Sequence, residues 1–142
     1  MDIPDLKRFL AETFPAADAF GFAIAALDED HLVLSLPTQA KHLRPGGTVS
    51  GPTMMTLADT AAYLIILSHI GPVGLAVTTN LNIHFVSKPE PGELRATARL
   101  LKLGKRIAVV EVRLHGPGAG GLYAHATVTY SIPPGSAAPQ PG

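Results

Sequence analysis

The spacing of hydrophobic residues predicts a short amphipathic helix at the start of the chain. One side of a helix over residues 3–14 would carry its large hydrophobic residues, which are Ile3, Leu6, Phe9, Leu10 and Phe14. Pro15 then ends the pattern. We expect this N-terminal segment, residues 1–18, to act as a lid or a brace. Two strands, residues 20–27 and 31–36, are predicted to follow as a hairpin that turns at the acidic run "DED".

The middle of the chain is its most hydrophobic part. Between Pro45 and Ser87, Asp59 is the only Asp, Glu, Lys or Arg. A helix is predicted over residues 53–68, after a loop rich in Pro and Gly over residues 37–52. Because this helix has no polar side to present to water, we expect protein to wrap it on nearly all sides.

Four more strands are predicted in the second half, over residues 77–86, 92–103, 106–115 and 122–131. The first alternates cleanly, with hydrophobic residues on one face and Thr78, Asn80, Asn82 and His84 on the other. The last three should form a meander, because "LGKR" and "GPGAGG" between them are typical of turns.

The order of these elements predicts an α+β fold in one domain, residues 1–132. The helix would lie against a curved antiparallel sheet of five to six strands. The tail, residues 133–142, has little to bury and is expected to be disordered.

Composition indicates an oligomer. Charged residues make up 15% of the chain and hydrophobic residues 46%, whereas a typical domain is ~25% charged. A monomer of this size would have difficulty covering itself with polar surface, so we expect burial between subunits.

The net charge of zero argues against nucleic acid or a membrane surface as a partner. The absence of cysteine excludes thiolate chemistry and favours the cytoplasm, and no apolar run is as long as a membrane span requires.

Asp59 is the residue whose position needs a chemical explanation. Burying an ionised carboxylate is costly unless it is paired or hydrogen-bonded. In a structural interpretation, Asp59 is bonded to Thr56, Thr60, Tyr63 or a partner subunit. In a catalytic interpretation, a low-dielectric environment disfavours its charged form and makes it a general base or a nucleophile.

The loop and helix around Asp59 carry the pattern of a known enzyme family. The stretch "HLRPGGTVSGPTMMTLAD" resembles the motif H-x-N-x-x-G-x-x-H-G-G, followed by L-A-D, of hotdog-fold acyl-CoA thioesterases of the phenylacetic acid degradation (PaaI) type. The positions that match this motif are His42, Gly47, Gly51, Leu57, Ala58 and Asp59. The stretch "TTNLNIHFVSKPEPGELRATARLLKLGKR" is similar to the family's third strand and to the strand and turn beyond it. The resemblance covers roughly residues 20–132.

The resemblance implies a hotdog fold and hydrolysis of a small or aromatic acyl-CoA, with no cofactor beyond the coenzyme A of the substrate. It implies that Asp59 is the base or nucleophile and that the backbone N–H of Gly51 polarises the thioester carbonyl. Asp59 lies about 12 Å beyond Gly51 along one helix, too far to serve the same carbonyl. The family pairs protomers, so the resemblance implies a homodimer with shared active sites, and a homotetramer as a dimer of dimers.

Three positions depart from the family motif. Arg44 stands where the family usually has Asn, Ser50 replaces the His, and Pro52 replaces the second Gly. Because the family places that Asn and His near the thioester carbonyl, a second hypothesis is a non-catalytic hotdog module that binds acyl-CoA or another acyl ligand. A third is a hotdog dehydratase or hydratase, which would need a catalytic His where Ser50 stands.

Further residues are candidates for contact with the substrate. The substrate-binding candidates are His42, Thr48, Ser50, Pro52, Met55, Tyr63, Asn80 and Asn82. Among them, Met55 and Tyr63 would shape an acyl pocket or pack in the core, and Asn80 and Asn82 would line the pocket or a subunit contact.

Basic residues after the central strands are candidates for the phosphates of coenzyme A. These are Lys88, Lys102, Lys105 and Arg106, and their alternative role is that of ordinary charged turns. No spacing of histidines indicates a metal site. A triad of Ser50, His84 and Asp59 lacks any supporting motif.

Overall fold

The computed structural model describes residues 1–118 and 121–134, which form helices and strands close to the predicted ones. The helices are α1 (Ile3–Thr13), α2 (Pro15–Asp18), the 3-10 helix η1 (Ala40–His42) and α3 (Gly51–Ile70). The strands are β1 (Ala23–Leu27), β2 (His31–Pro37), β3 (Val77–Phe85), β4 (Glu93–Leu103), β5 (Ile107–His115) and β6 (Leu122–Ser131). The short helices α2 and η1 were not predicted. Most of the tail, residues 135–142, lies outside the described residues.

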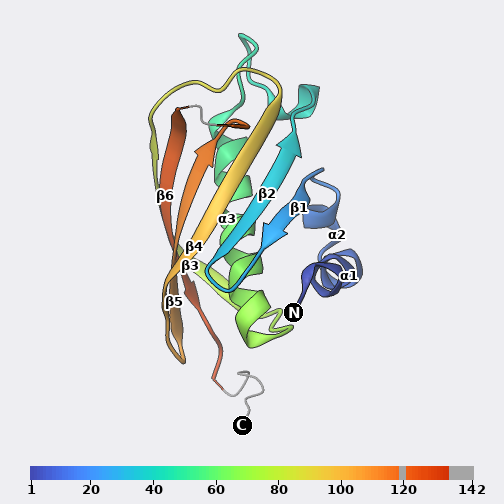
Figure 1. Ribbon diagram of the computed structural model, residues 1–142, viewed down its shortest axis with the longest axis vertical. Coiled ribbons are helices and arrows are strands. Elements are labelled where there is room, and N and C mark those ends of the chain that lie inside the picture. Colours follow the sequence, from blue (N-terminus) through green and yellow to red (C-terminus); the bar gives the residue numbers. More distant parts are fainter. Residues whose placement is uncertain (119–120, 135–142) are drawn as a thin grey trace.

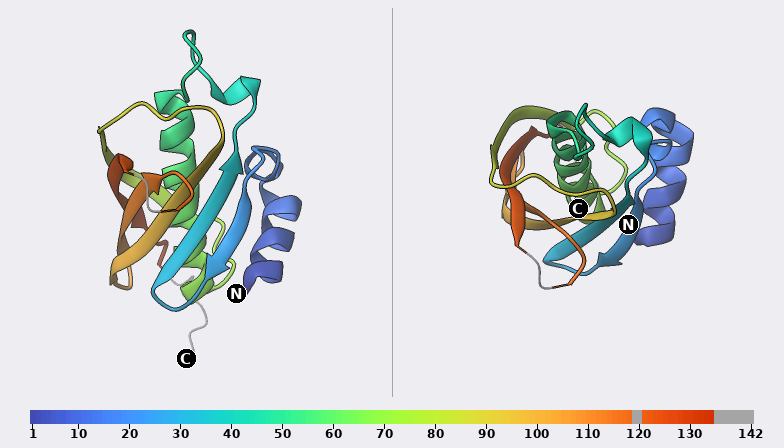
Figure 2. Two further views of the ribbon diagram at one scale, coloured as in Figure 1. Left: turned by 45° about the horizontal axis from the view of Figure 1, so that its top comes forward. Right: turned by 90° about the horizontal axis from the view of Figure 1, so that it is seen from above.

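The six strands form one antiparallel sheet in the order β1-β2-β4-β5-β6-β3. The meander of β4, β5 and β6 is confirmed, as is the hairpin of β1 and β2 (Figure 1). β3 does not pair with β4, which follows it in the chain, but lies at the edge of the sheet beside β6. The sheet curls around α3, and α1 lies to one side of that helix (Figure 2). The predicted α+β class is therefore confirmed.

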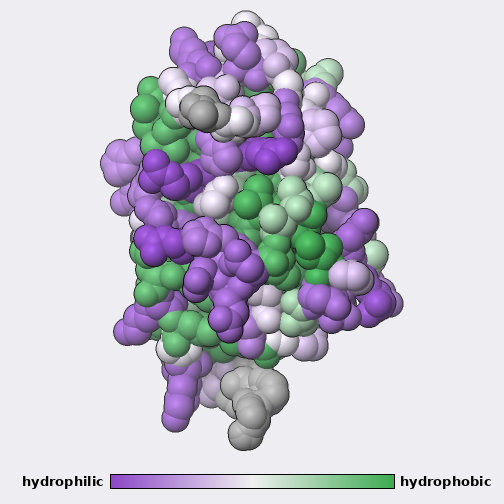
Figure 3. Space-filling view, in the orientation of Figure 1, coloured by the Kyte–Doolittle hydropathy of each residue, from purple (hydrophilic) through white to green (hydrophobic). Residues whose placement is uncertain are grey.

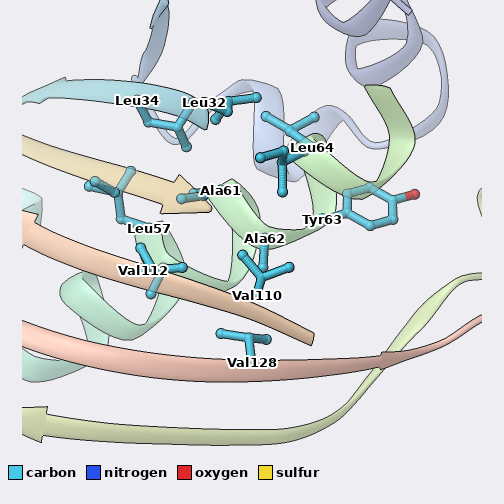
Figure 4. Packing of buried hydrophobic residues seen from close by; sticks show 14 of the residues in the cluster. Leu32, Leu34, Leu57, Ala61, Ala62, Tyr63, Leu64, Val110, Val112 and Val128 are labelled. Carbon is cyan, nitrogen blue, oxygen red and sulfur yellow. The ribbon is translucent and has the colours of Figure 1, made fainter. Parts of the chain in front are cut away.

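The core lies between α3 and the inner face of the sheet, as Figure 4 shows. Leu57 and Leu64 of α3 are fully buried, and Val110 and Val128 of β5 and β6 face the helix near Ala62. Alanines on both surfaces let the helix approach the strands closely. They are Ala58, Ala61 and Ala62 on α3 and Ala96, Ala98, Ala108, Ala124 and Ala126 on the sheet. Within the described ranges, α3 alone is long and apolar enough to cross a membrane, and the same properties suit a helix enclosed by a sheet.

One side of α3 is less covered than the sequence predicts. Pro52, Met55 and Thr56 are exposed, and Asp59 and Thr60 are only partly buried. The expectation that protein wraps this helix on nearly all sides is wrong for a single chain. The physical reason is that the sheet ends at β3, so this stripe of the helix faces a gap between β3 and the N-terminal helices.

A bulge changes which residues of β3 face the helix. Thr78 pairs with Tyr130, but Asn80 pairs with Thr129, so Thr79 is an extra residue in β3. The prediction that Thr78 shares a face with Asn80, Asn82 and His84 is therefore wrong. Because Tyr130 faces inward, its partner Thr78 also lies on the inner side of the sheet.

The outer face of the sheet carries a charged network, and Figure 3 shows polar side chains gathered on this face. His125 Nε2 lies 2.8 Å from Glu111 Oε2, and Arg99 donates to Glu111 Oε1 at 3.4 Å. The hydrogen bond from His125 is the main reason that the pKa of the Glu111 carboxyl is lowered, and the positive charges of His125 and Arg99 add to the effect. Glu111 is thus held in its ionised form in the folded state.

Glu111→Gln should lower the thermal midpoint at neutral pH by about 3–5 °C, since a partly buried ion pair contributes about 1 kcal/mol. Because the folded-state pKa is the lower one, this stabilisation is complete above pH 4.5 and disappears as the pH falls through the lowered value. Thermal unfolding from pH 7 to pH 3 would measure this. Glu90→Gln, at an exposed carboxyl without a hydrogen bond among the described residues, is the matched control. An equal effect of both substitutions at neutral pH would contradict the assignment.

Candidate active site

The gap beside α3 is a cavity of about 720 Å³. Its floor is formed by Met55, Thr56, Asp59 and Thr60 of the less covered side of α3, together with the buried Tyr63. Residues of α1, α2 and the following turn form one wall. The other wall is formed by Gly74, Ala76, Val77, Thr78 and Leu81. The cavity is mainly apolar, as pockets for small organic ligands usually are. Of the residues that the structure describes, Asp59 is the only Asp, Glu, Lys, Arg or His that lines it.

Two hydroxyl groups hold the carboxylate of Asp59. Thr78 Oγ1 donates to Asp59 Oδ1 at 2.7 Å, and the Tyr130 hydroxyl donates to the same oxygen at 2.9 Å. No hydrogen bond to Oδ2 and no ion pair to Asp59 forms among residues 1–118 and 121–134. Asp59 is therefore a fixed carboxylate whose second oxygen is available in the cavity. Thr56, Thr60 and Tyr63, the partners expected in a structural role, do not bind it.

Tyr130 stays a hydrogen-bond donor over the whole working pH range. Burial raises the pKa of its hydroxyl strongly, and the negative charge of Asp59 adds to this effect. The phenol therefore remains protonated at neutral pH. The two donors hold Asp59 in one orientation without neutralising its charge.

The start of α3 leaves one backbone donor free. Ser50 caps the helix, with its Oγ accepting from the Thr53 backbone N–H at 3.1 Å. Pro52 has no N–H to offer. The N–H of Gly51 has no acceptor among the described residues, so it is the unpaired donor at the positive end of the helix dipole.

Gly51 lies directly beside the aromatic ring of Phe85. A Cβ atom at this position would lie 3.4 Å from that ring, which is an ordinary van der Waals distance. Phe85 lies against the helix start, whereas Thr78 at the other end of β3 binds Asp59.

His42 is buried and makes structural hydrogen bonds in this chain, and its predicted contact with substrate stays a prediction. The side chain is 1% exposed and does not line the cavity. Its Nδ1 accepts from the Gln39 backbone N–H at 2.9 Å, and its Nε2 lies 3.1 Å from the carbonyl oxygen of Phe20. The carbonyl of His42 accepts from the Ser50 N–H and the Thr53 hydroxyl. His42 therefore fixes the loop that carries the start of α3.

His42→Ala should lower the free energy of unfolding by about 2–4 kcal/mol, because it leaves a cavity and removes partners from buried backbone groups. Urea denaturation would measure the loss. Thr48→Ala, in the same loop and without a side-chain hydrogen bond among the described residues, should change stability by less than about 0.5 kcal/mol. Unchanged stability in His42→Ala would contradict the structural role.

The other predicted substrate contacts lie in three different places. Met55 and Tyr63 line the cavity. Ser50, Pro52 and Thr48 lie at the start of α3, outside it. Asn80 and Asn82 lie on the outer side of β3, where they pair with Thr129 and Thr127 of β6. They alternate with Leu81, which lines the cavity, so they do not line it within one chain. Both of their predicted roles, in a substrate site or in a subunit contact, stay predictions.

The four basic candidates do not form one cluster within a chain. Lys88 follows β3 at the end of the sheet where α3 begins (Figure 1). Lys102, Lys105 and Arg106 lie in the β4–β5 hairpin at the opposite end, beside the start of β3. All four are exposed.

Sequence reasoning did not identify Thr78, Tyr130 and Phe14 as cavity residues. Thr78 was placed on the wrong face of β3, and Tyr130, 71 residues from Asp59, had no signal that linked it to that residue. Phe14 was assigned to the hydrophobic side of α1 but lines the cavity instead. In the described part of the chain no group of three His, Cys, Asp or Glu residues could hold a metal.

Comparison with known proteins decides the family. The model of the thioesterase superfamily matches residues 46–120, a segment that contains both Gly51 and Asp59. The chain belongs to the thioesterase superfamily. Its hotdog fold and its class of activity, thioester hydrolysis, follow from that membership, and the predicted resemblance is confirmed.

This thioesterase is similar to several known proteins over nearly all of its length. A Silicibacter protein named for an inferred thioesterase activity is 46% identical, with a TM-score of 0.85 over 94% of this chain and 93% of that one. The phenylacetic acid degradation protein PaaI of Thermus thermophilus, in a mutant form, is 26% identical with a TM-score of 0.73 over 84% and 99% of the two chains. A Pseudomonas aeruginosa protein named for an inferred esterase activity is 31% identical over 94% of this chain and 99% of its own.

Proposed function

We propose that this thioesterase hydrolyses acyl-CoA thioesters with small or aromatic acyl groups, using Asp59 as general base or nucleophile. The observation that carries the proposal is the carboxylate of Asp59 in a mainly apolar cavity, with one oxygen held by two hydroxyl groups and the other free. Because Asp59 lines the cavity, its unbonded oxygen can take a proton from water there or attack a thioester carbon. The apolar cavity suits an acyl group, and no metal or other cofactor is required for this chemistry.

The geometry of β3 supports an active site shared by two subunits. β3 is the last strand of the sheet, so one of its edges has no neighbour in the chain. Suppose that two copies of β3 pair antiparallel, with Leu81 of one subunit opposite Leu81 of the other. Phe85 of one subunit then lies opposite Val77 of the other. Gly51 lies beside Phe85, and Asp59 binds Thr78, next to Val77. This pairing therefore brings the free N–H of one subunit toward the carboxylate of its partner.

Hydrolysis in such a site proceeds through a tetrahedral intermediate. Asp59 takes a proton from water, whose oxygen bonds to the thioester carbon, and the Gly51 N–H donates to the developing oxyanion. The carbon–sulfur bond then breaks, and the coenzyme A thiolate takes up the proton. In the nucleophilic route Asp59 attacks first and water cleaves the resulting anhydride. A single turnover in ¹⁸O-labelled water distinguishes the two routes. Only in the nucleophilic route can water attack the Asp59 carbon of the anhydride, which leaves the label in the Asp59 carboxylate.

The same pairing supports a site for the phosphates of coenzyme A. Lys88 follows the Phe85 end of β3, and Lys105 and Arg106 lie near the Val77 end, because Ser131 pairs with both Val77 and Ile107. Antiparallel pairing of β3 would therefore bring Lys88 of one subunit toward the hairpin of the other. Basic side chains from two subunits would then bind one anionic group. We extend the proposal to a tetramer formed as a dimer of dimers.

Thiol release from a panel of acyl-CoAs tests the proposal. We expect turnover of at least one short or aromatic acyl-CoA, and light scattering at micromolar concentration should give a dimer or a larger assembly. Tight binding of acyl-CoA without thiol release would instead identify a binding module. A monomer that retains full activity would overturn the shared site.

A further inference from the structure

The elbow between α1 and α2 holds Phe14 in a fixed position. Phe14 is both the C-cap of α1 and the N-cap of α2, and Pro15 prevents α1 from continuing. Its N–H donates to the Leu10 carbonyl at 2.8 Å, and its own carbonyl accepts from Ala17 and Asp18 at 3.1 Å each. All backbone polar groups of Phe14 are thus used, so its backbone conformation is well determined.

The side chain of Phe14 is not buried by this arrangement. It is 47% exposed and lines the cavity that contains Asp59. A large apolar side chain on a fixed backbone normally packs into the core, as Leu6 and Leu10 of the same helix do. The exposed face of the Phe14 ring is therefore available to an apolar group inside the cavity.

Aromatic rings connect Asp59 with Phe14 along one wall of the cavity. The Tyr63 ring stacks on that of Tyr130, which binds Asp59, with ring centroids 5.8 Å apart and an interplanar angle of 24°. Phe14 packs edge-on against Tyr63, with the two ring centroids 6.4 Å apart. Tyr63 lies one helical turn, about 6 Å, past Asp59. Its hydroxyl points away from the packed core in Figure 4.

We propose that Phe14 closes the distal end of the acyl cavity and sets the longest acyl group that this enzyme accepts. This inference rests on the proposed function, because it takes the thioester carbonyl to lie at Asp59. From there the acyl group runs along Tyr63 and ends against the Phe14 ring. Short and medium acyl groups fit between these points, whereas a long chain meets Phe14 before its carbonyl reaches Asp59. The predicted lid thus acts as a selector of acyl length.

The experiment compares two substitutions of opposite effect. Phe14→Ala opens the distal end, and Phe14→Trp narrows it. We would measure kcat/KM for acetyl-, hexanoyl-, decanoyl- and palmitoyl-CoA. Phe14→Ala should raise the palmitoyl-to-hexanoyl ratio of kcat/KM by about 10-fold or more, and Phe14→Trp should shift the preference toward acetyl-CoA.

Leu75→Ala is the matched control, because Leu75 is also an exposed hydrophobic residue, 76% exposed, but does not line the cavity. It should leave the order of preference unchanged. An unchanged order in both Phe14 variants, with the wild type active, would overturn this inference and leave the proposed function intact. Wild type without activity on any acyl-CoA would overturn the proposed function. Calorimetric binding of the same series as uncleavable thioethers would then still test the length limit.

Discussion

Asp59→Asn is expected to lower kcat/KM by about 10² or more while the protein remains folded, because the amide cannot act as a base or a nucleophile. The substitution is nearly isosteric, and the amide oxygen can still accept from Thr78 and Tyr130, which hold Oδ1 in the native chain. The local structure should therefore survive. Steady-state thiol release with the best acyl-CoA, together with thermal unfolding, would measure both properties.

Tyr130→Phe provides the control for Asp59→Asn. It removes one of the two hydroxyl groups on Asp59 but leaves the carboxylate, so we expect a smaller loss of activity and a measurable loss of stability. If Asp59 were only structural, the order would reverse. Asp59→Asn would then be nearly silent in turnover, since its oxygen keeps both hydrogen bonds, and that result would overturn the catalytic role.

Gly51→Pro is expected to lower kcat by about 10² to 10³, because it removes the unpaired N–H at the start of α3. Proline is favoured at the first helical position, and Ser50 before it already has the extended conformation that precedes proline, with φ −73° and ψ 151°. Residue 51 is itself followed by Pro52, which disfavours the helical conformation at residue 51, so we also expect some loss of stability at this end of the helix. Circular dichroism and thermal unfolding would check folding, and thiol release would measure the rate.

Gly51→Ala is the matched control for Gly51→Pro. It adds a Cβ at the same place, 3.4 Å from the Phe85 ring, but keeps the N–H. We expect it to retain most of the activity. Equal losses in both variants would show that packing against Phe85, rather than the N–H, is what matters at this position.

Mixing the two inactive variants tests whether active sites are shared. A dimer of one Asp59→Asn subunit and one Gly51→Pro subunit contains one site with both native groups, if each site takes its N–H from one subunit and its carboxylate from the other. After unfolding and refolding an equal mixture, about a quarter of wild-type activity should return, because half of the dimers are mixed and each has one intact site. No recovery would place both groups in one subunit.

Much of the fold follows from local patterns in the sequence. The alternation in β3 and the apolar length of α3 mark these elements because side chains repeat every two residues in a strand and every 3.6 in a helix. The same local features identified Gly51 and Asp59, since glycine and a lone acid in an apolar segment stand out without any tertiary information. Their spacing of about two helical turns already indicated that one chain could not bring them together.

The errors arose where distant segments meet. Thr78 was placed on the wrong face because one extra residue in β3 reverses the alternation, and only pairing with β6 reveals it. Phe14 fits the hydrophobic side of α1, but Pro15 ends the helix there and turns the side chain to the cavity.

The sequence by itself determined the strands, the helices α1 and α3, the fold class, and the two residues around which the proposed chemistry is built, because these depend on neighbours within a few positions. Only the tertiary structure decided that β3 lies at the sheet edge, that Thr78 and Tyr130 hold Asp59, and that α1 and α2 close the cavity. These features depend on contacts between segments up to 71 residues apart. The free energies of such contacts cannot be inferred from a local sequence pattern.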